Sequence, residues 1–162
     1  MPPFEPLKED ATGLIDHQAL TSMSGMEFFE RHLAGELPSP PMCRVIPMRI
    51  LHAEPGHVRM EAGSNDDHLN PMGTVHGGFA MTVLDSCLSG AVHSRLEAGQ
   101  AYATIELKTN LVRPISPSDG RVLASAHSIH TGRSLATAEG RLVDEDGRIL
   151  AFATTTCAIF QV

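Results

Sequence analysis

The chain has 162 residues, of which 42% are hydrophobic and 19% charged, so it can form one packed domain and is too ordinary in composition for a disordered or fibrous protein. Its formal net charge is −7 and its few lysines and arginines are scattered, so we expect no nucleic-acid partner. Cys43, Cys87 and Cys157 lie far apart and form no Cys-x-x-Cys pair, which argues against a disulfide scaffold or a thiolate zinc site. These features favour a reduced, cytoplasmic setting.

The N-terminal residues mix prolines with acids and lack the basic start and apolar run of a signal peptide. We predict a loosely ordered arm over residues 1–22 and a single domain over residues 23–162. The most apolar segment, residues 77–92, is shorter than the roughly 20 residues that cross a bilayer, and it contains Asp85. We therefore expect no membrane partner.

The expected elements begin with a short amphipathic helix, for which Ser24 opens a capping-box pattern. Residues 45–63 predict two short strands around a Glu-Pro-Gly turn, and residues 77–92 predict a long helix. Period-two alternation over residues 103–111 predicts a strand with one more polar face, and the turn-rich remainder predicts an antiparallel meander, giving about four strands after the helix. This order predicts an α+β domain with a sheet wrapped on a helix.

The predicted central helix is apolar around most of its circumference, which is typical of a buried helix. Its polar residues fall on one stripe at 100° per residue: Thr82, Asp85, Ser86, Ser89 and His93. A solvent-facing stripe would normally carry Lys, Glu and Arg. Three interpretations remain: solvent exposure, a structural acid satisfied by Ser89 or a nearby backbone group, or an Asp85 carboxylate that acts as general base or nucleophile.

Gly77 and Gly78 open this helix, and their backbone N–H groups can be approached closely by a developing oxyanion at the positive helix end. Glycine pairs before helices also form simple turns. Eight residues at a rise of 1.5 Å put Gly77 and Asp85 about 12 Å apart along the axis. If both act on one substrate, Gly77 of one subunit must work with Asp85 of another, which predicts active sites at the interface of a two-fold dimer.

The nine histidines raise the question of a metal site. His52, His57 and His68 lie in different segments, and His127 and His130, three residues apart on a strand, point to opposite faces. We therefore predict no metal site.

Three segments together resemble the hotdog-fold acyl-CoA thioesterases of the phenylacetyl-CoA (PaaI-like) type: "HLNPMGTVHGGFAMTVLDSCLSGAVHS", "LKTNLVRP" and "HTGRSLATAEGRLVDEDGRILAFATTTC". The Asn-x2-Gly-x2-His-Gly-Gly-x6-Asp spacing is the most specific part. The resemblance implies a curved antiparallel sheet wrapped around a long central helix. It also implies a homodimer with a continuous sheet, often doubled to a homotetramer.

The resemblance implies roles for the residues that match the motif. Asp85 corresponds to the catalytic acid that activates water or attacks the thioester, and the Gly77 N–H corresponds to the oxyanion-hole donor. Asn70 takes the place of the amide residue near the reacting carbonyl or water. His76 matches the motif histidine beside the thioester.

Further positions match hydroxyls and cations of such enzymes. Thr104 corresponds to a residue that holds the lytic water in some relatives, and Ser89 matches a hydroxyl position in another branch. Arg113 and Arg133 are candidates for contacts with the CoA phosphates, because guanidinium pairs well with phosphate, although either could be a solvated loop charge.

The leading prediction is an acyl-CoA thioesterase that hydrolyses an aryl or medium-chain acyl-CoA to the free acid and CoA. No cofactor is expected, since CoA belongs to the substrate. Two alternatives remain: a non-catalytic protein that binds acyl-CoA or an aromatic ligand, and a hotdog hydratase or dehydratase. The hydratase needs an acid and histidine pair around the helix, and His76 precedes both the helix and Asp85.

Overall fold

A computed structural model describes residues 4–5, 8, 11–117 and 120–162. The elements, in chain order, are α1 (His17–Thr21), α2 (Gly25–Leu33), the 3-10 helix η2 (Pro41–Arg44), β1 (Met48–Glu54), β2 (His57–Ala62), the 3-10 helix η3 (Asp66–His68), α3 (Gly77–His93), β3 (Gln100–Leu111), β4 (Val122–Thr131), β5 (Leu135–Val143) and β6 (Ile149–Gln161). Within the described residues, no helix combines the length and apolar character needed to cross a membrane.

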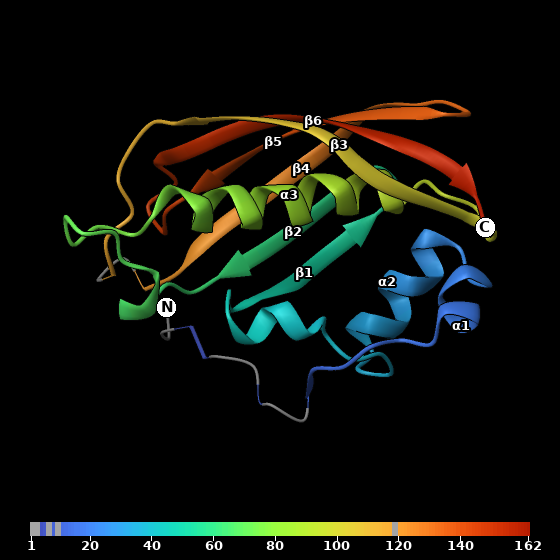
Figure 1. The fold of residues 1–162 in the computed structure, drawn as a ribbon, viewed down its shortest axis with the longest axis horizontal. Helices are drawn as coiled ribbons and strands as arrows, with labels where there is room; N and C mark the ends of the chain where they lie inside the picture. Colours follow the sequence, from blue (N-terminus) through green and yellow to red (C-terminus); the bar gives the residue numbers. More distant parts are fainter. Residues whose placement is uncertain (1–3, 6–7, 9–10, 118–119) are drawn as a thin grey trace.

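The strands form one antiparallel sheet in the order β1-β2-β4-β5-β6-β3. Figure 1 shows the sheet curving around the long helix α3, which packs against β2, β3, β4, β5 and β6. The α+β prediction, with a sheet wrapped around a central helix, is therefore confirmed. The predicted order of two strands, a helix and four strands is also confirmed.

The centre of the core is α3, as its apolar circumference predicted. Val83, Leu84, Cys87 and Leu88 have no exposed surface. Each such side chain contributes about 1.5–3 kcal/mol when it is removed from water, so this helix face is a main source of stability. The three cysteines are buried free thiols, in agreement with the sequence analysis.

The edge strand β3 departs from its predicted pattern. A register shift between Thr104 and Glu106 interrupts the alternation, which the sequence analysis took as continuous over residues 103–111. The bulge leaves the Ile105 side chain 60% exposed, whereas Leu107 packs against the core. Because a bulge adds one residue to one strand, Thr104 and Leu107 both face α3, and the prediction of opposite faces was wrong.

The N-terminal helices cover the C-terminal end of α3 (Figure 1). The Ser24 hydroxyl accepts a hydrogen bond from Glu27 N at 3.2 Å and caps α2, as predicted. The backbone of α2 lies close to the end of α3, because a Cβ added at Gly25 would lie 1.7 Å from the carbonyl oxygen of His93. The rings of Phe28 and Phe29 pack on the His93 imidazole at centroid distances of 5.0 and 5.6 Å.

Part of the predicted arm over residues 1–22 lies outside the described residues, namely residues 1–3, 6–7 and 9–10. In the described part, residues 17–21 form α1, and Asp16 caps this helix by accepting a hydrogen bond from Ala19 N. Thr12 forms an isolated bridge with Ser39. This segment therefore packs beside α2.

Candidate active site

Asp85 lies in the middle of α3, and its partner comes from the neighbouring edge strand. The Thr104 hydroxyl donates a hydrogen bond to Asp85 Oδ1 over 3.0 Å. Both residues are half-buried, and Asp85 forms no ion pair with any described residue. Plain solvent exposure therefore does not describe this acid. A carboxylate held by one hydroxyl and otherwise unpaired can accept a proton or attack a carbonyl.

Ser89 does not satisfy Asp85, contrary to one of the open interpretations. Its hydroxyl donates to the carbonyl oxygen of Ser86 at 3.4 Å. Burial raises the pKa of the Tyr102 phenol, and the nearby Asp85 carboxylate raises this pKa further, so the phenol stays protonated at neutral pH.

The sequence analysis missed Tyr102. This residue precedes Thr104 by two positions on β3, and strand periodicity puts residues two apart on the same face. Its ring packs against the His93 imidazole at a centroid distance of 5.4 Å. The period-two signal could therefore have identified it once Thr104 was singled out.

A cavity of about 560 Å³ lies beside this part of α3. On α3 it is lined by Ser86 and Ser89, and its remaining lining is mainly apolar, including Phe28, Phe29, Met48 and Ile50. His93 also lines the cavity, and burial lowers its pKa to about 4, so its imidazole is neutral at physiological pH. Asp85 and Thr104 are not among the residues that line the cavity, and its mainly apolar walls suit an apolar group.

The N-terminal end of α3 presents a backbone donor. His76 is the N-cap residue, and its Nδ1 accepts a hydrogen bond from Gly78 N at 2.9 Å. Within the described part of the chain, no group accepts a hydrogen bond from the N–H of Gly77. This free donor at a positive helix end can stabilise negative charge on an oxygen.

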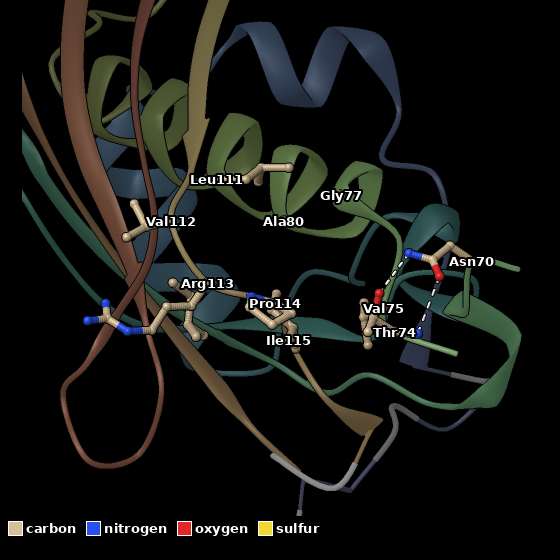
Figure 2. Close-up of a pocket in the computed structure, with 11 residues that line it drawn as sticks. Asn70, Thr74, Val75, Gly77, Ala80, Leu111, Val112, Arg113, Pro114 and Ile115 are labelled. Carbon is tan, nitrogen blue, oxygen red and sulfur yellow. Dashed lines mark hydrogen bonds between the residues drawn. The ribbon is translucent and has the colours of Figure 1, made fainter. Parts of the chain in front are cut away.

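A second cavity, of about 310 Å³, adjoins this helix end (Figure 2). Gly77, Asn70 and Arg113 all line it, so the structure brings three of the predicted site residues together. The Leu111 side chain also reaches it, and a Cβ at Gly77 would lie 2.6 Å from Leu111 Cδ1. A side chain at Gly77 would therefore displace only the end of the flexible, half-exposed Leu111 side chain.

The Asn70 amide is occupied within its own loop. Its Oδ1 accepts hydrogen bonds from the N–H groups of Met72 at 2.9 Å and Thr74 at 3.3 Å, and its Nδ2 donates to Thr74 Oγ1 at 2.8 Å. Such a side chain imitates a backbone turn. In this conformation Asn70 shapes the loop that leads to His76.

The two candidate phosphate-binding arginines lie apart. Arg113 Nη1 donates to the carbonyl oxygen of Ile149, at the start of β6, and its guanidinium points away from Gly77 in Figure 2. Arg133 is exposed in the turn after β4, near the far end of β6, and does not line either cavity described above. One chain therefore does not bring Arg113 and Arg133 to a common phosphate.

The reasoning that separated His52 from His57 was wrong. These residues lie on the two strands of one hairpin, and their rings are 6.1 Å apart. The His57 ring also stacks on the His127 ring at 4.1 Å. The turn between β1 and β2 brings them together, although the sequence analysis recognised that turn.

The comparisons with known proteins agree with this architecture. Residues 72–151 match the family model described as the Thioesterase superfamily. A phenylacetic acid degradation-related protein of Ralstonia eutropha, described as a candidate thioesterase, is 30% identical. That match covers 81% of this chain and 98% of the other, with a TM-score of 0.73. The chain belongs to the thioesterase superfamily and has the hotdog fold.

Curated relatives extend the comparison to acyl-CoA hydrolysis. The 1,4-dihydroxy-2-naphthoyl-CoA hydrolase of Listeria monocytogenes is 25% identical over 114 residues, which cover 70% of this chain and 91% of that enzyme. A Pseudomonas aeruginosa protein described as a candidate esterase, PA1618, is 32% identical over 90 residues. Those residues cover 55% of this chain and span 61% of that relative.

Proposed function

We propose that this protein is an acyl-CoA thioesterase that hydrolyses the thioester of an aryl or medium-chain acyl-CoA. The observation that carries the proposal is the hydrogen-bonded pair of Asp85 on α3 and Thr104 on β3. Ser86 and Ser89, neighbours of Asp85 on α3, line the larger cavity, and the first residue of that helix, Gly77, presents a free N–H. Membership of the thioesterase superfamily and the similarity to a naphthoyl-CoA hydrolase support it.

In the proposed reaction, the Gly77 N–H and the helix end polarise the thioester carbonyl. Asp85 of the partner subunit either activates a water molecule or attacks the carbonyl carbon itself. A carbon–oxygen bond forms, the carbon–sulfur bond breaks and CoA leaves as a thiolate, which then takes up a proton. Where Asp85 itself attacks, water then hydrolyses the resulting mixed anhydride, releasing the free acid and restoring the carboxylate. Thr104 positions the carboxylate through its hydrogen bond.

The length of α3 supports a dimer. Gly77 and Asp85 lie on one uninterrupted helix, about 12 Å apart along its axis, so a single chain cannot direct both at one carbonyl. The outer edge of β3 supports pairing with a second copy, because this long edge strand exposes Ile105 and Leu111 and pairs only with β6 among the described residues.

We propose a homodimer with two interfacial sites, doubled to a homotetramer. Size-exclusion chromatography with light scattering tests this assembly, and a monomer at micromolar concentration would contradict it. A cytoplasmic location fits three buried free thiols and a CoA substrate.

The larger cavity suits the acyl group. Apart from Arg49, whose guanidinium pairs with the buried Glu61 carboxylate, its described lining carries no Lys, Arg, Asp or Glu side chain. Burial of an apolar acyl group there lowers the free energy of the complex. An acyl chain that ends in a carboxylate would bind less well, because the carboxylate would lose its hydration. For the CoA phosphates we propose Arg113 of one subunit and Arg133 of another as contacts, because the two lie at opposite ends of β6.

The test is a turnover panel of acetyl-CoA, octanoyl-CoA and phenylacetyl-CoA, with release of free thiol measured after the protein's own thiols are subtracted. We expect thiol release in all three assays, with a higher kcat/KM for the two larger acyl groups. Saturable binding without thiol release would instead support the non-catalytic alternative. Conversion of an enoyl-CoA without thiol release would support the hydratase.

A further inference from the structure

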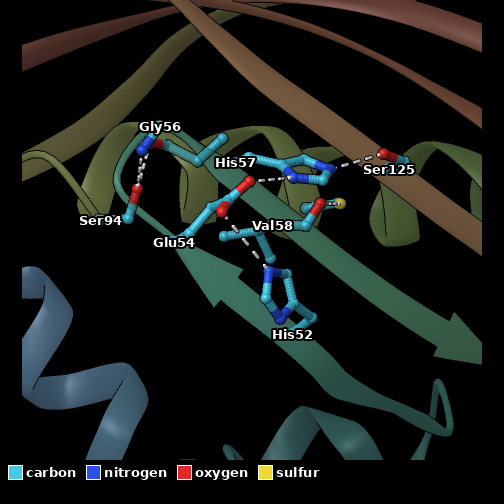
Figure 3. A network of polar contacts seen from close by, with 9 residues as sticks. His52, Glu54, Gly56, His57, Val58, Ser94 and Ser125 are labelled. Atoms are coloured by element: carbon cyan, nitrogen blue, oxygen red, sulfur yellow. Dashed lines mark hydrogen bonds and ion pairs between the residues drawn. The ribbon is translucent and has the colours of Figure 1, made fainter.

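The outer face of the sheet carries a second cluster of chemically active side chains, outside the candidate active site. On the β1–β2 hairpin, the Glu54 carboxylate lies between two imidazole rings (Figure 3). His57 Nδ1 is 3.0 Å from Glu54 Oε1, and His52 Nε2 is 3.9 Å from Glu54 Oε2. One nitrogen or oxygen from each residue lies within 4.8 Å of the others.

Strand register explains why these three side chains converge. Glu54 is directly opposite His57 across the hairpin, and His52 precedes Glu54 by two positions on the same strand. Residues two apart on a strand, and residues opposite each other, share a face. Val58, the next residue after His57, is fully buried under α3, so the cluster faces away from the core.

The His57 ring is fixed by a hydrogen bond at the nitrogen that faces away from Glu54. Its Nε2 forms a hydrogen bond with Ser125 Oγ on β4 at 3.0 Å. A hydroxyl can donate or accept, so Ser125 can accept the Nε2 proton when an ion occupies the Nδ1 lone pair, whereas without an ion an Nδ1 proton can be donated to Glu54. A hydrogen bond on the remote ring nitrogen is the usual support of a histidine that binds a metal.

The turn between the ligands is also anchored. Gly56 N donates to Ser94 Oγ at 2.8 Å, and the carbonyl oxygen of Gly56 accepts from Ser128 N at 2.8 Å. These bonds tie the hairpin tip to the end of α3 and to β4, as Figure 3 shows for Ser94. A fixed turn keeps the ligand residues close before any ion binds, which reduces the entropy lost on binding.

Folding stability alone does not account for this arrangement. The side chains of His52 and Glu54 are 50% and 58% exposed, and exposed ion pairs contribute little to folding stability. Arg59, opposite His52 in the register, adds a positive charge nearby and limits affinity for cations.

We propose that His52, Glu54 and His57 form a binding site for a divalent transition-metal ion of the zinc type, with water completing the coordination. Zinc binds imidazole nitrogen and carboxylate oxygen at about 2.0–2.2 Å, and a tetrahedral ion separates such donors by roughly 3.3 Å. Rotation of the exposed His52 and Glu54 side chains brings the donors to that spacing. Magnesium and calcium prefer oxygen ligands and are poor candidates.

The experiment is calorimetric titration of tag-free protein with zinc chloride. We expect saturable binding of one zinc ion per chain. The substitutions His52→Ala and His57→Ala should each weaken it at least about tenfold, and Ser125→Ala should do so less strongly. The matched control is His130→Gln, which removes an exposed histidine on β4 outside the cluster and should leave the affinity unchanged.

Two results would overturn the proposal. One is the absence of saturable zinc binding to the wild-type chain. The other is an affinity that is the same in the wild type and in the His52 and His57 variants, which would assign the zinc to another part of the chain. All four positions are on the sheet surface or half-exposed, and circular dichroism of each variant checks that the fold is retained.

Discussion

The middle and the N-terminal end of α3 differ in what a single chain supplies. In the middle, Asp85 already has its hydroxyl partner, Thr104, and the neighbouring Ser86 and Ser89 line a cavity with mainly apolar walls. The N-terminal end has a free backbone donor at Gly77 and a smaller cavity, but no carboxylate lines that cavity. We propose that each region supplies half of an acyl-transfer site, because the length of helix between them keeps one chain from joining the halves.

The largest effect is expected when the acid in the middle of α3 is neutralised. Asp85→Asn keeps an acceptor for the Thr104 hydroxyl but removes the base or nucleophile, so kcat should fall about 1,000-fold with little change in the melting temperature. Steady-state thiol release measures this. Asp66→Asn, at an exposed acid in η3, is the control, and equal turnover in the two variants would remove Asp85 from the mechanism.

At the other end, the Gly77 N–H can be deleted with little disturbance of the backbone. Proline is tolerated at the first position of a helix, and the preceding residue, His76, has an extended backbone that suits it. Gly77→Pro should lower kcat about 100-fold. Gly77→Ala brings the same contact with Leu111 but keeps the N–H, so comparable loss in both variants would indicate a packing effect.

A smaller loss is expected from the hydroxyl that supports Asp85. Thr104→Val removes the hydrogen bond without changing the side-chain volume, and kcat should fall about tenfold, because a hydrogen bond to a charged group contributes about 1.5–3 kcal/mol. KM should change little. Thr104→Ser keeps the hydroxyl and should retain most of the activity. An equal loss of kcat in Thr104→Ser and Thr104→Val would mean that the hydroxyl is not the group that matters.

The pH dependence of folding stability tests the packing of α2 on His93, at the C-terminal end of α3. The folded-state pKa of His93 is about 4, below the ordinary value of 6.5, because burial disfavours the imidazolium. The stability of the fold with a neutral His93 is intact above pH 6.5. It is lost as pH falls toward 4, because the His93 imidazole takes up a proton in the unfolded chain before it does so in the folded one. The loss is about 3 kcal/mol in free energy of unfolding.

Urea unfolding at pH 7 and pH 4 measures that loss. His93→Phe keeps a ring against Phe28 and Phe29 and should be less sensitive to acid by the same amount. His130→Gln, at an exposed histidine, should behave as the wild type. An unchanged acid sensitivity in His93→Phe would show that other groups control it.

Local signals predicted much of the fold. The apolar circumference of residues 77–92 predicted the buried helix, and the Glu-Pro-Gly turn predicted the first hairpin. The β3 bulge could not be predicted, because one extra residue at Ile105 depends on pairing with β6. Convergence of His52 and His57 was missed because it follows from cross-strand register rather than from sequence spacing.

The candidate site was predicted in part. Spacing along one helix identified Gly77 and Asp85 and their separation, because helical rise is fixed. The hydrogen bond from Thr104 depends on how β3 lies against α3, whereas strand periodicity could have identified Tyr102. The position of α2, which lines the larger cavity, depends on packing at Gly25. These contacts join segments far apart in the chain.

The claim that each active site combines Gly77 of one subunit with Asp85 of the other is tested most directly by mixing inactive chains. Asp85→Asn and Gly77→Pro chains with different tags are co-expressed, and the heterodimer is purified. One of its two interfacial sites then has both Gly77 and Asp85 intact, so turnover should return to about half of the wild-type value per dimer. Heterodimer activity no higher than that of the two parent variants would contradict the account.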